Sequence, residues 1–315
     1  MEEAPFHAAI SGGPEGGRAL WLHTADERRI RLGLWPAAGE ARGTVFIFPG
    51  RTEYIEKYGL AAAEFTARGY DVLAIDWRGQ GLADRPLADQ MMGHVERFAE
   101  YQIDLAAVLH AAEALDLPRP WLALGHSMGG TIALRALSRP HPFAAVTLSA
   151  PMLGIALNAP MRQIALPLAR VLLDNPRARR YAPETSEVTY VLTDGFQNNF
   201  LTTDAMMWAK LIEQVAEVPA LALGGPSLHW VAEALLECQA LLKLPAPDLP
   251  CYCALGTDER VVDSTAIRQR LKDWPAARLE MFPGVQHEIM MDKPETGARF
   301  YASCLALFDA ATGAA

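Results

Sequence analysis

Short hydrophobic runs alternate with longer mixed stretches through the first half of this chain, and this alternation sets the elements that we predict. The runs "TVFIF" at 44–48 and "YDVLAID" at 70–76 have the length of buried strands. Between them, residues 54–69 have helix-forming composition and close on Gly69, a common helix stop. The rest of this half continues the pattern, with further strands predicted at 121–124 and 144–151 and helices at 94–114 and 131–139.

Two runs near the start, "RALWLH" at 18–23 and "RIRLGLW" at 29–35, indicate a hairpin that precedes this alternation. Strands that alternate with helices indicate a parallel sheet, because each parallel pair needs a crossover connection and the crossover helices cover both faces. We therefore predict an α/β fold with a mostly parallel central sheet and helices on both faces.

The alternation stops near Pro151. The stretch 152–248 is rich in Met, Leu and Ala, contains several prolines and shows no strand pattern. Strand and helix patterns then return at 251–255, 277–282 and 295–310. The simplest interpretation is a core in two parts, 1–151 and 249–315, with a helical cap inserted at 152–248.

The length of the chain fits this domain organisation, and its net charge argues against one class of partner. The chain has 315 residues, of which 51% are hydrophobic and 21% charged, which suits one large α/β domain with an insertion. A formal net charge of −9 argues against a nucleic-acid partner, which usually requires a basic surface. The one dense basic run, "NPRARRY" at 175–181, is short, and we favour a solvated surface over an anion site there.

From the sequence we expect neither a secretory signal nor a membrane-spanning segment. Its start has no basic segment followed by an apolar one, and no apolar run approaches the roughly 18 residues that span a bilayer. The four cysteines have no metal-ligand spacing, and we interpret them as reduced core thiols: Cys238, Cys251, Cys253 and Cys304. The expected location is the cytoplasm.

The stretch "WLALGHSMGGTIAL" at 121–134 contains the first candidate for chemistry. A predicted strand leads into Gly125-His126-Ser127-Met128-Gly129 and a predicted helix leads out of it. This is the setting of a nucleophile elbow, in which the serine hydroxyl is exposed at the carboxyl edge of the sheet. We interpret Ser127 as a nucleophile; the alternative is a structural serine in a tight turn.

A serine nucleophile needs a base, and in α/β folds of this kind a histidine follows the last strand. The segment "MFPGVQHEIMMD" provides a strand, a Pro-Gly turn and then His287. The other seven histidines fit less well. His126 sits inside the elbow and cannot easily fold back onto the hydroxyl of its neighbour.

The acid that orients the histidine should follow the preceding strand. The stretch "CYCALGTDERVVDS" offers Asp258, Glu259 and Asp263, and adjacent acids at a turn point in different directions. Hydrolases of this class often have Gly-x-x-Asp, then one residue and two apolar residues. With Gly256 as that glycine, Glu259 is the favoured acid and Asp258 the alternative.

The oxyanion of an acyl-transfer reaction needs two main-chain N–H donors. One should be the N–H of Met128, directly after the nucleophile, and the other the N–H of Arg51, in the loop after the strand at 44–48. The alternative interpretation of that loop is a plain connection between a strand and a helix.

These residues resemble the lysophospholipase and monoacylglycerol lipase branch of the α/β-hydrolase superfamily, and most of all bacterial lysophospholipase L2-type proteins. Monoacylglycerol lipases usually have His-Gly at the oxyanion loop, and here Pro49-Gly50 favours the lysophospholipase group. They also usually have aspartate as the acid, from which Glu259 departs. The matching segments span most of the chain: "PGRTEYIEKY", "DWRGQGLADRP", "GHSMGG", "FQNNFLTTD", "LALGGPSLHW", "GTDERVVDS" and "GVQHEIMMD".

The resemblance implies a metal-free serine esterase without a cofactor, acting on a single-chain acyl lipid through an acyl-serine intermediate. Another serine hydrolase with the same triad is the main rival: a short-chain carboxylesterase, a thioesterase or a proline-type peptidase. A non-catalytic binding protein on this fold is less favoured because serine, acid and histidine are all present in order. An aspartate in place of Ser127 would have indicated dehalogenase-like chemistry.

The predicted cap bears on the substrate. An apolar tunnel over the serine would suit an acyl chain, since burying each CH₂ contributes about 0.8 kcal/mol. The segment 159–173 is apolar with a few arginines, so it either makes weak peripheral contact with a lipid surface or packs on the core. Pro167 interrupts it and favours packing. We interpret Trp208 and Trp230 as core residues rather than substrate contacts.

Overall fold

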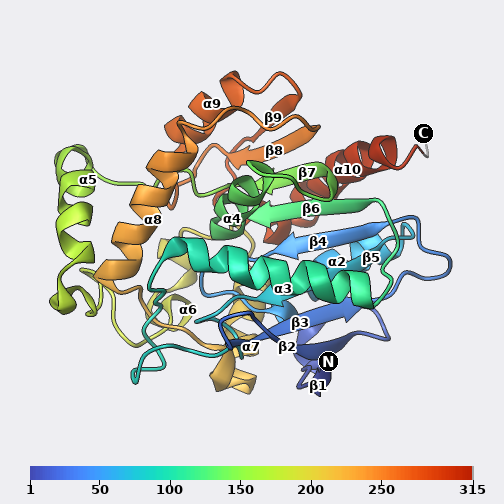
Figure 1. The fold of residues 1–315 in the computed structure, drawn as a ribbon, viewed down its shortest axis with the longest axis horizontal. Helices are drawn as coiled ribbons and strands as arrows, with labels where there is room; N and C mark the ends of the chain where they lie inside the picture. The colour runs from blue at the N-terminus through green and yellow to red at the C-terminus, as the bar shows by residue number, and fades with distance from the viewer. Residues whose placement is uncertain (314–315) are drawn as a thin grey trace.

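A nine-stranded sheet forms the centre of the computed structural model, which describes residues 1–313 apart from the side chains of residues 159 and 162 (Figure 1). The strand order is β1-β2-β3-β5-β4-β6-β7-β8-β9. Neighbouring strands are antiparallel from β1 to β5 and parallel from β5 to β9, so the sheet is mostly parallel as predicted. The strands are β1 (Glu2–Ala4), β2 (Arg18–His23), β3 (Arg29–Trp35), β4 (Thr44–Phe48), β5 (Asp71–Asp76), β6 (Trp121–His126), β7 (Phe143–Ser149), β8 (Cys251–Gly256) and β9 (Ala277–Phe282).

Helices cover both faces of this sheet (Figure 1). Side chains alternate along each strand, so Phe46 of β4 packs into one apolar core and Val45 into the other. The first core is completed by α3 (Tyr101–Ala114), α4 (Met128–Leu137) and α9 (Ser264–Lys272). The second is completed by α2 (Gly59–Thr66) and α10 (Pro294–Ala311).

Two predicted helices begin later than expected. The range 94–114 was predicted as one helix, but α3 begins at Tyr101, after a 3-10 turn (η2, Phe98–Glu100). His94 instead contacts the inserted segment, where its Nδ1 lies 2.8 Å from Ser227 Oγ. The range 54–69 likewise starts with a 3-10 turn (η1, Ile55–Tyr58) before α2. Short elements at the start, β1 and α1 (Ala8–Ser11), were not predicted.

The segment between β7 and β8 contains no strand among the described residues, only isolated bridges and helices. These helices are α5 (Ala159–Leu173), α6 (Tyr190–Thr193), α7 (Ala205–Glu217) and α8 (Leu228–Leu241), with 3-10 turns η3 (Pro176–Ala178), η4 (Phe196–Asn198) and η5 (Pro219–Leu221). In Figure 1, α5 and α8 lie beyond the arrowheads of β4 and β6, at the carboxyl ends of the strands. The interpretation of residues 152–248 as a cap stays a prediction.

The cysteines, two tryptophans and the helix lengths can also be compared with the expectations from the sequence. All four cysteines are free and buried, as expected for core thiols. Trp208 and Trp230 are both buried. Within the described chain, no helix is long and apolar enough to cross a bilayer.

Candidate active site

Ser127 stands at a strained turn between β6 and α4. Its φ is 49° and its ψ is −118°, a left-handed conformation that a non-glycine residue adopts only at a cost of about 1–3 kcal/mol. Surrounding hydrogen bonds hold the turn: Ser127 N donates to Ser149 O over 3.0 Å, and Ser127 O accepts from Met152 N over 2.9 Å. The strand, the turn and the helix together have the geometry of a nucleophile elbow.

A glycine behind the serine lets the elbow approach the neighbouring strand. A Cβ on Gly129 would lie 1.8 Å from Phe48 O, at the end of β4, so no other residue fits there without moving the main chain. The start of α4 therefore lies directly against the loop that follows β4. A Cβ on Gly50 in that loop would lie 3.2 Å from Ser127 Cβ.

His287 and Glu259 come together from the loops after β9 and β8. The His287 Nδ1–H donates to Glu259 Oε2 over 2.8 Å, which leaves the other ring nitrogen, Nε2, to act on a proton. The second oxygen of Glu259 accepts from Val261 N at 2.6 Å and Val262 N at 3.1 Å. Burial opposes ionisation of this carboxyl, but His287 and the two N–H groups outweigh it and lower the pKa of Glu259.

The neighbouring acids lie elsewhere. Asp258 is exposed, and its Oδ1 accepts from Thr257 Oγ1 over 3.1 Å rather than from the histidine. Asp263 caps α9 by accepting from Thr265 N over 2.9 Å. Of the three candidate acids, the structure thus brings Glu259 to His287.

Ser127 and His287 line one cavity, with 8% and 4% of their surfaces exposed. Among the described residues no hydrogen bond joins the serine hydroxyl to the imidazole. Catalytic hydrogen bonds are often loose before substrate binds, so this geometry is compatible with a nucleophile and its base.

The main-chain N–H groups predicted to hold the oxyanion are not used by the fold. In residues 1–313 neither Arg51 N nor Met128 N has a hydrogen-bond partner, whereas Gly50 N donates to Glu53 Oε2. Trp77 fixes the loop by donating from Nε1 to Pro49 O over 3.1 Å. Two unpaired main-chain N–H groups in the loops next to a serine can donate hydrogen bonds to an oxyanion.

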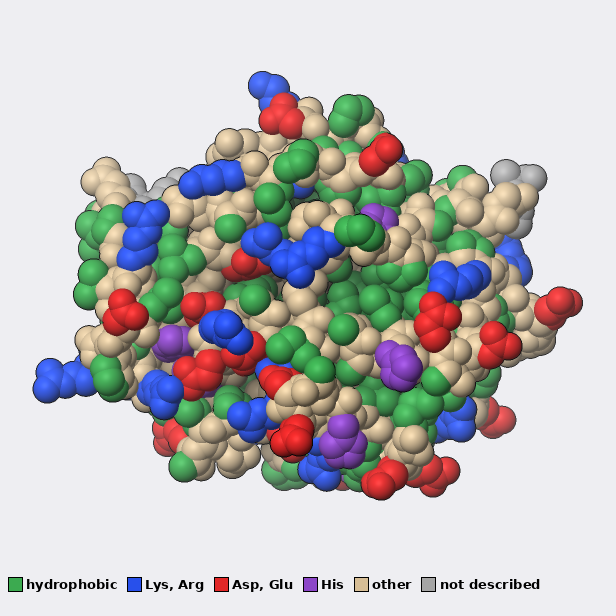
Figure 2. Space-filling model, in the orientation of Figure 1, with side chains coloured by type: hydrophobic (Ala, Val, Ile, Leu, Met, Phe, Trp, Pro, Cys, Tyr) green, Lys and Arg blue, Asp and Glu red, His purple; other side chains and the backbone are tan. Residues whose placement is uncertain are grey.

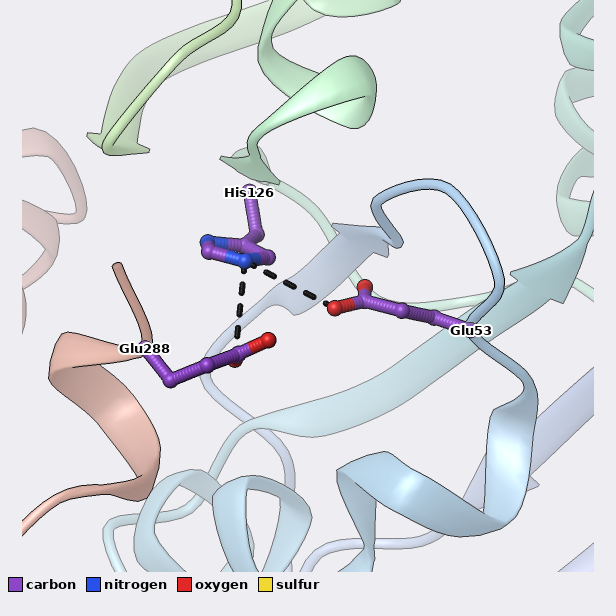
Figure 3. A group of neighbouring side chains, drawn as sticks. All are labelled: Glu53, His126 and Glu288. Carbon is purple, nitrogen blue, oxygen red and sulfur yellow. Dashed lines mark ion pairs between the residues drawn. The ribbon is translucent and has the colours of Figure 1, made fainter. Parts of the chain in front are cut away.

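A buried group of charged side chains that was not predicted from the sequence lies directly behind the serine and the histidine. His126 and Glu288 are the chain neighbours of Ser127 and His287, and the two histidine rings are 4.8 Å apart. Figure 3 shows His126 facing both carboxylates, with its Nε2 3.6 Å from Glu53 Oε1 and 3.5 Å from Glu288 Oε2. Its Nδ1 lies 3.1 Å from a main-chain carbonyl oxygen.

Lys57 completes this group. Its Nζ donates to Glu53 over 2.5 Å and to Glu288 over 2.7 Å, and all four residues are buried. The spacing of Glu53 and Lys57, four residues apart, is the one sequence signal that would have found the pair. Nothing in the sequence indicates that Glu288 meets them.

The ionisation of this group is set by its members. Burial disfavours the imidazolium of His126, but the Glu288 and Glu53 carboxylates outweigh burial and raise the pKa of His126. Burial also opposes ionisation of Glu288, yet Lys57 and His126 hold the pKa of Glu288 well below its usual range. The group is therefore closest to neutral when His126 is charged.

Glu53, His126 and Glu288 offer three ligand atoms within 4.8 Å of one another, a set that metal ions accept. The ammonium of Lys57 already contacts both carboxylates and would repel a bound cation. Because the protein supplies its own counter-charge here, we assign no metal site to this group.

The cavity in front of Ser127 has a volume of about 700 Å³, within the range of small-molecule sites. Its wall combines the core with the inserted segment: Arg51 and Arg260 come from core loops, and residues 183–186, 188–191 and 200–201 come from the insertion. The arrangement can hold an acyl ester against the serine.

Known proteins match the chain over most of its length. The family model described as serine aminopeptidase, S33, matches residues 39–294. Lysophospholipase L2 of Escherichia coli K12 is 35% identical over 267 residues, which cover 79% of this chain and 75% of that protein. A probable lysophospholipase L2 of Haemophilus influenzae is 29% identical over 276 residues, 86% of each chain.

Solved structures match with lower identity. A soluble variant of monoglyceride lipase from Saccharomyces cerevisiae aligns with a TM-score of 0.71 and 18% identity, over 92% of this chain and 94% of that one. A thermostable carboxyl esterase from Bacillus coagulans aligns with a TM-score of 0.74 and 15% identity, over 95% and 100%. At these identities the likeness shows the fold alone.

Proposed function

This chain belongs to the serine aminopeptidase S33 family of the α/β-hydrolase superfamily, and on that premise we propose that it hydrolyses carboxylic esters of single-chain acyl lipids. The observation that carries the proposal is the similarity to lysophospholipase L2 across most of both chains. The lysophospholipase and lipase relatives make it a serine ester hydrolase, and they do not favour the thioesterase or peptidase alternatives.

In the proposed reaction Ser127 attacks the ester carbonyl while His287 takes the hydroxyl proton, and Glu259 stabilises the resulting imidazolium. The N–H groups of Arg51 and Met128 hold the oxyanion. His287 then returns the proton to the leaving alcohol, and an acyl-serine remains. A water molecule, deprotonated by His287, attacks this ester, and the fatty acid leaves as Ser127 regains its proton.

We further propose that the inserted segment acts as a cap with peripheral membrane contact, in a protein of the cytoplasm. Along α5, Met161, Ile164, Leu168 and Val171 share one face at helical spacing and are 39%, 53%, 44% and 67% exposed. Figure 2 shows hydrophobic side chains gathered at the end of the molecule where α5 lies in Figure 1. An exposed apolar helix face suits a lipid surface.

The first test is fatty-acid release from a lysophospholipid and from a monoacylglycerol with the same acyl chain. Ser127→Ala should lower release by about 10⁴-fold or more, because the nucleophile is lost. Labelling of the wild type by a fluorophosphonate, absent in the variant, reports the serine independently of the lipid. Labelling without release from either lipid would retain the serine hydrolase and discard the lipid substrate.

A further inference from the structure

Resting on the lipid esterase proposed above, we infer that Arg51, with Arg260, forms a binding site for the phosphate of the substrate's headgroup. The cavity is then built for acyl esters that carry a phosphate, such as lysophospholipids, in preference to neutral monoacylglycerols. The inference starts from two arginines that share the cavity wall with Ser127.

Arg51 is a cation without an anion. Its Nη1 donates to Gly224 O over 3.0 Å, and its Cζ lies 5.7 Å from the centre of the Trp230 ring. Within the described chain it forms no ion pair, and its remaining N–H groups are neither hydrogen-bonded nor sealed inside the protein. They are available to a ligand in the cavity.

The other arginines with little exposure are better satisfied. Arg31 and Arg78 each contact two or more carboxylates. Arg85 and Arg270 lack a carboxylate too, but their guanidinium groups donate to three and two main-chain carbonyls, respectively. Arg51 combines the poorest set of partners with a place beside the nucleophile.

Partial burial of such a cation is unfavourable when no anion pairs with it. Burial lowers the pKa of Arg51 to about 10, so the guanidinium still carries its charge at neutral pH. A phosphate supplies both the missing charge and two oxygens that match the fork of the guanidinium. Binding a phosphate would offset the desolvation cost of the guanidinium.

Arg260 adds a second unpaired cation. It is exposed, its Cζ lies 5.6 Å from the centre of the Phe200 ring, and it forms no ion pair within residues 1–313. Of the acids in the cavity wall, Glu53 and Glu288 already pair with Lys57 and face His126. The other two, Glu184 and Asp194, are exposed residues of the insertion that pair with neither arginine.

The position of Arg51 also fits the geometry of a lysophospholipid. Its N–H is proposed to face the oxyanion, and its side chain reaches away to Gly224 of the insertion. The headgroup phosphate is likewise set apart from the ester carbonyl by the glycerol unit. Arg51 can therefore contact the ester oxyanion through its main-chain N–H and the headgroup phosphate through its side chain.

The test compares kcat/KM for 1-palmitoyl lysophosphatidylcholine and for 1-palmitoylglycerol in Arg51→Met. Arg51→Met removes charge-assisted hydrogen bonds to the phosphate. The ratio of kcat/KM for the lysophospholipid to kcat/KM for the monoacylglycerol should therefore fall by about 10- to 100-fold. Arg51→Lys should restore part of the ratio, and Arg260→Met should lower it less than Arg51→Met. Arg268→Met, an exposed arginine on α9 outside the cavity, is the matched control and should leave the ratio unchanged.

A structural role, in which Arg51 only ties its loop to Gly224, would lower both values equally and overturn the inference. A second readout does not depend on the lipid substrate: sn-glycerol 3-phosphate should inhibit hydrolysis of p-nitrophenyl butyrate competitively, and at least tenfold more weakly in Arg51→Met. Absence of inhibition in the wild type would also overturn the phosphate site. Inhibition without hydrolysis of either lipid would instead retain the site and reject the lipid esterase.

Discussion

Asp258 and Glu259 are adjacent in the chain but differ in their surroundings. Glu259 is held by two main-chain N–H groups and faces His287, whereas Asp258 is exposed and contacts a threonine hydroxyl. A single residue step at a turn reverses the direction of the side chain. Glu259 is therefore placed to orient the proposed base, whereas Asp258 is an ordinary surface residue.

Glu259→Gln should lower kcat for p-nitrophenyl butyrate on the order of 10³- to 10⁴-fold, because a neutral amide neither fixes the histidine tautomer nor stabilises its charge. Asp258→Asn is the matched control and should change kcat by less than about threefold. Steady-state kinetics on both variants decide the assignment. A larger loss in Asp258→Asn would transfer the role to Asp258.

Among the helices, α5 has one face packed against the protein and another face exposed to solvent. Ala165 and Ala169 are buried on the side that packs along α8, while the stripe from Met161 to Val171 is exposed. Pro167 lies within the helix without ending it, so the break that the sequence suggested does not occur. Small residues on the packed face and large ones on the exposed face reverse the usual arrangement of a surface helix.

Ile164→Asp and Val171→Asp should each weaken binding to vesicles of phosphatidylglycerol and phosphatidylcholine by about tenfold or more, because a charge replaces an apolar group at the lipid boundary. Co-sedimentation with the vesicles measures this. Ala106→Asp places the same charge at an exposed position of α3, which belongs to the core and not to the insertion. This control variant should bind as the wild type does. Equal binding by all three variants would remove α5 from the proposed contact.

At the scale of the whole molecule, the sheet brings distant segments to one edge. Ser127, Glu259 and His287 follow β6, β8 and β9, and the loop with Arg51 follows β4. The ends of parallel strands lie side by side, so these residues meet although more than two hundred positions separate the first from the last. The same convergence buries His126 against Glu53 and Glu288.

The buried charged group makes stability depend on pH. Because the pKa of His126 is raised above its ordinary 6.5, its contribution to stability is fully present below pH 6.5 and is lost as pH rises through the folded-state value. The pKa of Glu288 is held below 4.5, so its contribution is present above pH 4.5 and is lost as pH falls further. Stability should therefore be greatest between these limits.

His126→Gln should lower the free energy of unfolding by about 3–5 kcal/mol near pH 6, and the difference from the wild type should shrink as pH rises. Urea unfolding followed by tryptophan fluorescence between pH 5 and 9 measures it. His110→Gln, an exposed histidine on α3, is the control and should follow the wild-type curve. A difference that stays constant with pH would show that His126 acts through packing alone.

Local sequence patterns predict the fold class and most of the strands correctly. Hydrophobic periodicity and turn residues are local, so β4 and β9 fall on the predicted ranges 44–48 and 277–282. The order of strands and motifs likewise placed Ser127 and His287 at the ends of strands. These features depend on neighbours in the chain, which the sequence displays directly.

Which side chains contact each other is not visible in the local patterns. The approach of Glu259 rather than Asp258 to His287, the joining of Glu53 and Lys57 with Glu288, and the unpaired guanidinium of Arg51 all depend on contacts between separate loops. The late start of α3 has the same cause, since His94 contacts the insertion instead of continuing the helix. Such contacts are set by packing and burial across the folded chain, and local periodicity carries no record of them.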